Sequence, residues 1–353
     1  MLEKQERNYG IDLVKIVAMF MIVTLHVLGC GGVLGASVGN QKNCAVAWFL
    51  EIAAFGAVNI YAMASGYLCV SSGHKYKSIV LLWMQVFFYT AIITAMFYVN
   101  NPGTVGKQQI INAVFPVTTT QYWYFTGYFC MFFFIPVMNA ALEHLEKRQL
   151  QRILAVAFVL FSILPTIFAV DPFHENDGYS ALWLAVLYMV GGYIRKYGLF
   201  EKVPSAVLGL SYLVLVVITW AIKWKKEETA ISFGGLVSYL SPTIVLAAIC
   251  IFLVFSRIKV KHLKKSIKWI ASATFGVYLI HTHPLIWNYI LIGRFSDCAS
   301  AGLTRMGIGV IAAVFMIFAG CTVIDSIRKL LFMGVSYAVN YFTKNLHGNK
   351  EMS

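Results

Sequence analysis

The sequence predicts an all-α membrane protein, a polytopic bundle of about ten transmembrane helices with both termini in the cytoplasm. Hydrophobic residues make up 59% of the 353 positions and charged residues only 12%, with a mean hydropathy of +0.73. A soluble domain could not bury that much apolar surface. The apolar stretches are mostly near the ~20 residues that cross a ~30 Å hydrocarbon core. They lack the alternating pattern of barrel strands, so we expect helices.

Ten apolar segments follow one another with mostly short connections, and they form one predicted integral-membrane domain, 1–353, without a soluble domain. The sixth is short for a membrane span. The segments lie at roughly 11–30, 45–70, 79–99, 121–142, 152–170, 179–194, 204–222, 236–256, 270–291 and 302–324.

The positions of lysine and arginine orient the bundle. With the N-terminus inside, the inner segments carry 20 of them and the outer segments 7, while Lys15 lies within the first span. This bias follows the positive-inside rule. The net charge of +13 therefore reflects topology, and no basic domain outside the bilayer indicates a nucleic-acid partner. We expect a multi-pass protein of the cell membrane, in a bacterium the inner or plasma membrane, whose first span is not cleaved.

The segment after the tenth span, 326–346, mixes apolar residues with Arg328, Lys329 and Lys344. We expect it to be an interfacial amphipathic helix. An eleventh span is disfavoured because Asp325, Arg328 and Lys329 lie at its start.

The first span carries a polar stripe. Lys15 and His26 are eleven residues apart, which places them on nearly one helix face and ~16 Å apart along the axis. Asp12 lies one turn before Lys15, close to the same face. Ionisable side chains at membrane depth face protein or a water-filled cavity, and they indicate a functional site.

Glu51 enters the second span at a depth similar to that of His26. A carboxylate paired with His26 would fix the imidazole tautomer and raise its basicity, as a general base requires. The alternative is that Glu51 faces solvent near the interface.

His281 lies near the middle of the ninth span, at the depth expected for His26. It either lines the same cavity or is only an interhelical hydrogen-bonding residue. The histidines and Glu51 lack metal-ligand spacing, so no metal is expected. Seven cysteines give no C-x-x-C pair, and Cys30 and Cys44 bound the first outer loop and could form a disulfide.

Aromatic residues begin the fourth span at Trp123 and Tyr124. They fit an aromatic belt at the membrane interface. Alternatively, their ring faces and the phenolic hydroxyl could bind a sugar.

Four stretches taken together resemble the acyltransferase-3 family of integral-membrane acyltransferases. The first resembles the family's opening helix, which has a basic residue, ten intervening residues and a histidine, here Lys15 and His26. The second ends in Ser-Gly-Tyr, the third contains Tyr-Leu-Ile-His, and the fourth starts with Trp-Tyr. The stretches are RNYGIDLVKIVAMFMIVTLHV, VNIYAMASGYL, SATFGVYLIHTHPLIW and WYFTGYFCMFFFIPVMNAAL.

The resemblance implies transfer of an acyl group, usually acetyl, from cytoplasmic acyl-coenzyme A to a carbohydrate or lipid-linked glycan, with no bound cofactor. It implies that His26 is the essential catalytic residue and that Lys15 is the basic residue of the same motif. Family members often show two arginines three apart at the third span, whereas this chain has only Lys75 and Lys77 nearby. These lysines can attract the donor's phosphates but lack the guanidinium fork.

Two other classes compete with an enzyme. A transporter or flippase of a lipid-linked sugar also has buried charges, although the two related halves typical of transporters are not visible. A non-catalytic membrane sensor or anchor would not need His26 for its cellular function.

Overall fold

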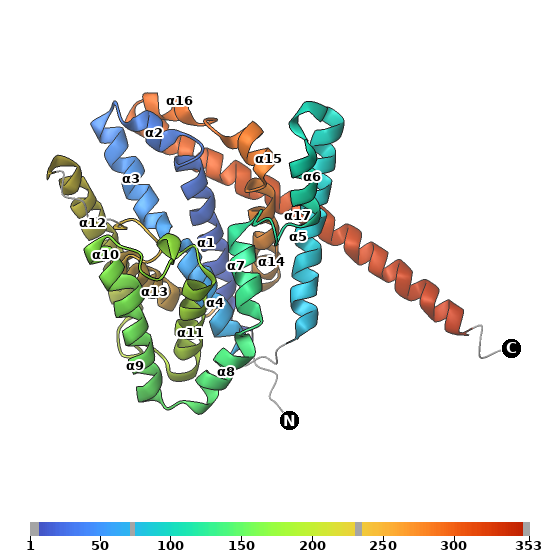
Figure 1. Ribbon diagram of the computed structural model, residues 1–353, viewed down its shortest axis with the longest axis horizontal. Helices are drawn as coiled ribbons and strands as arrows, with labels where there is room; N and C mark the ends of the chain where they lie inside the picture. The colour runs from blue at the N-terminus through green and yellow to red at the C-terminus, as the bar shows by residue number, and fades with distance from the viewer. Residues whose placement is uncertain (1–6, 71–74, 230–234, 349–353) are drawn as a thin grey trace.

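The computed structural model describes residues 7–70, 75–229 and 235–348, and within these ranges the chain forms helices and no strand. Figure 1 shows them as one bundle. The helices are α1 (Tyr9–Leu28), α2 (Val33–Ser37), α3 (Gln41–Phe55), α4 (Ala57–Cys69), α5 (Tyr76–Asn100), α6 (Lys107–Val114), α7 (Trp123–Phe132), α8 (Ile135–His144), α9 (Lys147–Phe158), α10 (Leu164–Phe168), α11 (Ala181–Tyr197), α12 (Ser205–Thr229), α13 (Pro242–Ser256), α14 (Lys264–His281), α15 (Pro284–Ile286), α16 (Ser296–Ser300) and α17 (Leu303–Gly348).

Six helical stretches of the described chain are long and apolar enough to cross a membrane, and a seventh is a pair of helices bent by 57°. Helices also lie at the other three predicted positions. These helices are α11 and α13, which are short for a membrane span, and α14, whose start carries three lysines. A polytopic membrane bundle is therefore supported, and the number ten stays a prediction. The six stretches are Tyr9–Leu28, Gln41–Cys69, Tyr76–Asn100, Lys147–Phe168, Ser205–Lys225 and Leu303–Gly334, and the bent pair is Trp123–Phe132 with Ile135–His144.

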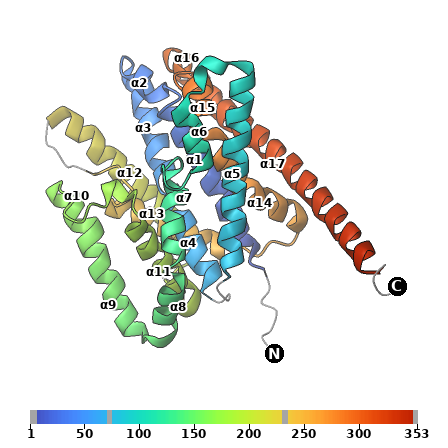
Figure 2. The ribbon, with the colours of Figure 1, turned by 45° about the vertical axis from the view of Figure 1, so that its right-hand side comes forward.

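The two ends of the bundle can be told apart by the elements that lie there. Figure 1 places the start of α1 and the connection from α8 to α9 at the lower end. The short helices α2, α6 and α16 lie at the upper end, and Figure 2 shows the same separation after rotation. Following the predicted orientation, in which the N-terminus is inside, we name the lower end the inner end and the upper end the outer end.

Helix α1 packs against α3, α4, α13, α14 and α17, so it lies within the bundle rather than at its edge. Its start is fixed by Asn8, whose side-chain oxygen accepts hydrogen bonds from the backbone N–H groups of Gly10 and Ile11. A Cβ at Gly10 would lie 2.0 Å from the carbonyl oxygen of Phe255. The absence of a side chain there lets α1 approach α13 closely, as small residues do in membrane helix packing.

Helices α4 and α11 pack closely against each other. A Cβ at Gly66 would lie 1.9 Å from the carbonyl oxygen of Tyr188, and one at Gly191 would lie 2.0 Å from that of Met63. Only glycine fits at either position without moving a backbone. This contact fixes α4, which carries the Ser-Gly-Tyr sequence, against the next layer of the bundle.

The C-terminal segment extends the last span. Residues 326–346 continue it as the single helix α17, which extends away from the bundle in Figures 1 and 2, and the position of this part at the membrane interface stays a prediction. The charges expected to interrupt a span are paired within the protein. The fully buried carboxylate of Asp325 lies 2.8 Å from Arg328 Nε and 3.0 Å from Lys329 Nζ and accepts a hydrogen bond from the Tyr89 hydroxyl.

Candidate active site

His26 lies near the end of α1, next to His281, which is buried at the end of α14. The His26 Nδ1 atom is 2.9 Å from Nε2 of His281, and the His281 Nδ1 atom is 2.5 Å from the carbonyl oxygen of Val277. The two rings lie 5.0 Å apart between centroids. The rings of His26 and Trp287 also meet edge to face, with their centroids 4.7 Å apart and an interplanar angle of 74°.

This chain of hydrogen bonds determines where the protons lie. A carbonyl oxygen can only accept, so His281 Nδ1 carries a hydrogen and donates it to Val277. In neutral His281, Nε2 is then the acceptor, and His26 Nδ1 must be the donor. Nε2 of neutral His26 is therefore left with a free lone pair, which is the state that a general base needs.

Two cavities meet at His26. The polar cavity has a volume of about 440 Å³ and lies toward the outer end of α1. Its lining residues are Leu25, His26, Gly29, Cys30, Glu51, Phe55, Gln121, Tyr122, Trp123, Tyr179, Tyr239, Tyr278, Thr282 and Trp287.

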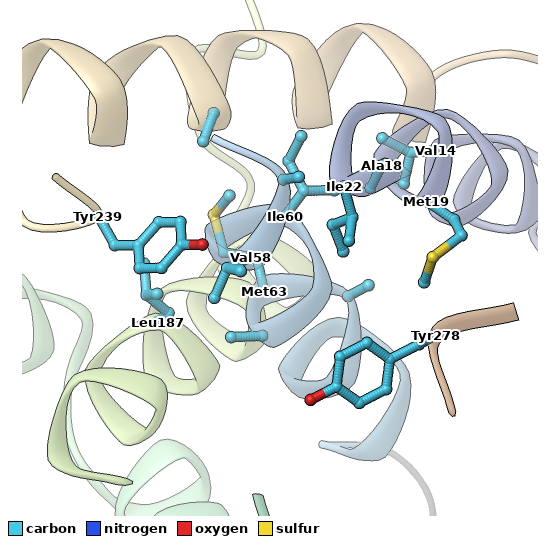
Figure 3. Close-up of a cluster of buried hydrophobic side chains, with 14 of the residues drawn as sticks. Val14, Ala18, Met19, Ile22, Val58, Ile60, Met63, Leu187, Tyr239 and Tyr278 are labelled. Atoms are coloured by element: carbon cyan, nitrogen blue, oxygen red, sulfur yellow. The ribbon is translucent and has the colours of Figure 1, made fainter. Parts of the chain in front are cut away.

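The apolar cavity is much smaller, about 50 Å³, and follows α1 from His26 back toward Met19, one turn from Lys15. Figure 3 shows Met19 and Ile22 projecting from α1, with the rings of Tyr239 and Tyr278 on either side of α4. Leu25, His26, Trp123, Tyr239 and Tyr278 line both cavities. The imidazole of His26 thus borders a cavity in each direction along the helix.

Lys15 and Asp12 lie on the inner half of α1, but they do not pair with each other. Asp12 is 4% exposed and accepts two hydrogen bonds from the Arg7 guanidinium, at 2.6 and 2.8 Å. No ion pair or hydrogen bond of the Lys15 ammonium is found within the described chain, while its backbone carbonyl accepts a hydrogen bond from the Tyr61 hydroxyl. Asp12 was expected to contact substrate, yet its carboxylate is occupied by Arg7.

Lys75 and Lys77 lie at the inner start of α5, where both side chains are exposed. They line neither the polar nor the apolar cavity. Their expected contact with the donor would therefore occur at the surface of the bundle.

Arg195 of α11, which was predicted only as an inner charge and not as a site residue, lies beside the start of α1. Its Nη1 atom donates to the Tyr67 hydroxyl at 3.2 Å, and its guanidinium lies 5.0 Å from the centre of the Tyr67 ring. Asn8, the cap of α1, also donates to this hydroxyl at 3.4 Å. The Ser-Gly-Tyr sequence was a usable signal, because its tyrosine connects α4, α11 and the start of α1.

The expected pair of His26 and Glu51 is not formed, because His281 occupies Nδ1 of His26. Glu51 nevertheless faces the same polar cavity and is only 9% exposed. Its Oε2 atom is buried and has no hydrogen-bond partner among the described residues. The two side chains share a cavity without contacting each other through a hydrogen bond.

Of the two aromatic residues expected to bind a sugar, only Trp123 lines the polar cavity. Trp123 lines both and lies 4.3 Å from the ring of Tyr179, between centroids. Tyr124 lines only the apolar cavity and stacks on Tyr128. His281, also expected to contact substrate, lines neither cavity and contacts His26, which lines both.

No group of three or more potential metal ligands occurs in residues 7–70, 75–229 and 235–348. Cys30 and Cys44 are both free thiols in this structure. The Cys30 thiol lies 3.0 Å from the carbonyl oxygen of His26.

Comparison with known proteins gives one result that covers most of the chain. No curated protein and no solved structure matches it. A family model described as an acyltransferase domain matches residues 8–325, a range that includes α1, with Lys15 and His26, and extends to Asp325 of α17. The chain therefore belongs to the acyltransferase-3 family of membrane acyltransferases, which act on carbohydrates.

Proposed function

We propose that the protein transfers an acyl group, most simply acetyl, from cytoplasmic acyl-coenzyme A to a hydroxyl group of a cell-envelope carbohydrate or lipid-linked glycan. The observation that carries the proposal is the position of His26, where the polar and apolar cavities meet and where His281 holds its Nδ1 proton. One side chain can then act on two substrates that arrive from opposite sides of the membrane.

The reaction needs a base and a positioned thioester. His26 Nε2 takes the proton of the acceptor hydroxyl while that oxygen attacks the thioester carbonyl carbon. When the tetrahedral intermediate collapses, the carbon–sulfur bond breaks and the coenzyme A thiolate leaves. The thiolate takes the proton from the imidazolium of His26, which returns the base to its neutral form. The Nε2 lone pair of His281 accepts the Nδ1–H throughout and stabilises the imidazolium.

The donor would approach from the inner end. Lys15 of α1 and Arg195 of α11 are cations of that end, next to Tyr61 and Tyr67 of α4. Phosphates of the donor would bind these cations, and the thioester arm would extend along α1 over a distance of ~16 Å to His26. The apolar cavity holds only about 50 Å³, so side chains such as Met19 must move aside as the arm inserts.

The acceptor would occupy the polar cavity. Its walls combine the ring faces of Trp123 and Tyr179 with the carboxyl group of Glu51 and the amide of Gln121. Apolar ring faces with a few convergent polar groups are typical of small-molecule sites.

The test uses purified protein in liposomes with acetyl-coenzyme A and an envelope glycan fraction from cells that lack the protein. We expect release of the free thiol that depends on the glycan, and loss of this release in His26→Ala. His262→Ala, which removes an exposed histidine, is the control and should react as the wild type does. Equal thiol release by His26→Ala and wild type would contradict the proposal, as would movement of glycan across the membrane without thioester consumption.

A further inference from the structure

The polar cavity carries almost no positive charge. Of the fourteen residues that line it, none is lysine or arginine, and Glu51 is the only acidic residue. A ligand carboxylate or phosphate buried there would lack a counter-ion, and an unpaired buried charge is strongly unfavourable. The cations of the outer end, such as Lys42 and Arg294, do not reach the lining.

The carboxyl group of Glu51 has an oxygen atom without a hydrogen-bond partner, which a ligand can supply. Its Oε2 atom is buried and finds no donor within the described ranges, although buried polar atoms nearly always have a partner. The side chain is more than nine-tenths buried and faces a cavity large enough for a sugar ring. The partner that fits this atom is a hydrogen-bond donor, such as a hydroxyl or an ammonium group.

The rest of the wall is suited to an apolar ring face rather than to a charge. Trp123 and Tyr239 lie nearly parallel, with an interplanar angle of 23° and centroids 5.9 Å apart. Tyr179 packs against both rings, and Trp287 contacts His26. These residues place flat apolar surfaces beside Glu51 and the proposed base.

From these three observations we infer that the sugar residue receiving the acyl group is uncharged or carries an amine, and that Glu51 accepts hydrogen bonds from it. Sugars that carry a carboxylate or phosphate on the acylated ring are excluded. The inference rests on the proposed function, because it specifies the acceptor of the same reaction.

One experiment locates the acyl group. The protein in liposomes is given radiolabelled acetyl-coenzyme A and the glycan fraction from cells that lack it, and labelled products are fragmented by tandem mass spectrometry. We expect the label on a neutral or amino sugar. Label on a uronic acid, a sialic acid or a phosphorylated sugar would overturn the inference. Absence of any labelled glycan would instead contradict the proposed acyl transfer.

A variant pair tests the role of Glu51. Glu51→Gln, which replaces one carboxyl oxygen with an amide nitrogen that cannot accept, should raise the KM for the labelled acceptor roughly tenfold, as expected for loss of one hydrogen bond, while the KM for acetyl-coenzyme A stays unchanged. The unchanged donor KM also shows that the variant is folded. The control is Asp297→Asn, which removes an exposed carboxylate at the outer end and should alter neither constant. An unchanged acceptor KM in Glu51→Gln would overturn the assignment.

Discussion

The imidazoles of His26 and His281 form a direct hydrogen bond between Nδ1 of the first and Nε2 of the second, at 2.9 Å. Because the carbonyl of Val277 holds the other nitrogen of His281, the pair has one proton arrangement when both rings are neutral. We therefore propose for His281 the orienting role that was expected of Glu51. Because it lines neither cavity, we expect it to act as a positioning residue.

This arrangement predicts a specific kinetic defect in His281→Ala. Loss of the partner allows His26 to adopt the wrong tautomer and removes the stabilisation of its imidazolium. The kcat should fall by about 100-fold, within the range that general-base catalysis contributes, while both KM values change little. His281→Gln, which can still accept the Nδ1–H, should recover part of the loss. Steady-state kinetics with varied donor and acceptor measure this.

The matched control is His283→Ala, which removes an equally buried histidine that contacts Gln121 rather than His26. Its kcat should remain well above that of His281→Ala. If the two variants were equally impaired, loss of packing at the end of α14 would explain the defect and the positioning role would be wrong.

Arg195 and Lys15 should act on the donor alone. Arg195→Ala should raise the KM for acetyl-coenzyme A by roughly tenfold, since charge-assisted contacts to phosphate are worth about 1.5–3 kcal/mol. Lys15→Ala should behave similarly, and neither should change the acceptor KM. Tyr67→Phe keeps the ring beneath Arg195 but removes the hydroxyl that holds it, so an intermediate effect is expected. Lys202→Ala, at an exposed inner position, is the control, and an equal KM change there would indicate only a general surface-charge effect.

The helices were predictable because each apolar stretch must bond its own backbone groups in the bilayer. The points at which a helix breaks or bends within a span were harder to predict, because they depend on the packing of neighbouring helices. Gly56 separates α3 from α4 where Ala248 of α13 lies close, and the bend between α7 and α8 falls just before Pro136. The continuity of α17 was missed because Asp325 is neutralised by Arg328 and Lys329 inside the protein.

The site was predictable along one helix and less so between helices. The eleven-residue spacing of Lys15 and His26 follows from helix geometry alone, and the depth of His281 was correctly expected to match that of His26. The choice between Glu51 and His281 as partner of His26 depends on how α3 and α14 rotate around α1, which periodicity within one segment does not fix. Arg195 was counted only as an inner charge, because its contact with Tyr67 joins residues 128 positions apart.

The contact of α4 with α11 should depend on Gly191. An alanine there would place its Cβ 2.0 Å from the carbonyl oxygen of Met63, which forces the helices apart and should cost about 1–3 kcal/mol of stability. Gly209→Ala is the control, because nothing lies within 4 Å of its added Cβ and the substitution favours helix by roughly 1 kcal/mol. Thermal unfolding in detergent should therefore show a lower midpoint for Gly191→Ala and an equal or higher one for Gly209→Ala. An unchanged midpoint for Gly191→Ala would contradict the close contact.

Glu175, in the connection between α10 and α11, should make stability depend on pH. Burial raises the pKa of its carboxyl group, although the Ser180 hydroxyl donates a hydrogen bond to it. The folded protein therefore binds this proton more tightly than the unfolded chain, whose glutamate pKa is ~4.3. The stabilisation is complete below that value and is lost as the pH rises through the higher folded-state pKa.

Glu175→Gln should thus raise the unfolding midpoint at pH 8, and its advantage should shrink toward pH 4, whereas the exposed Glu201→Gln should show neither effect. A midpoint for Glu175→Gln below that of the wild type at pH 8 would show that the ionised carboxylate stabilises the fold, opposite to the effect expected from its burial.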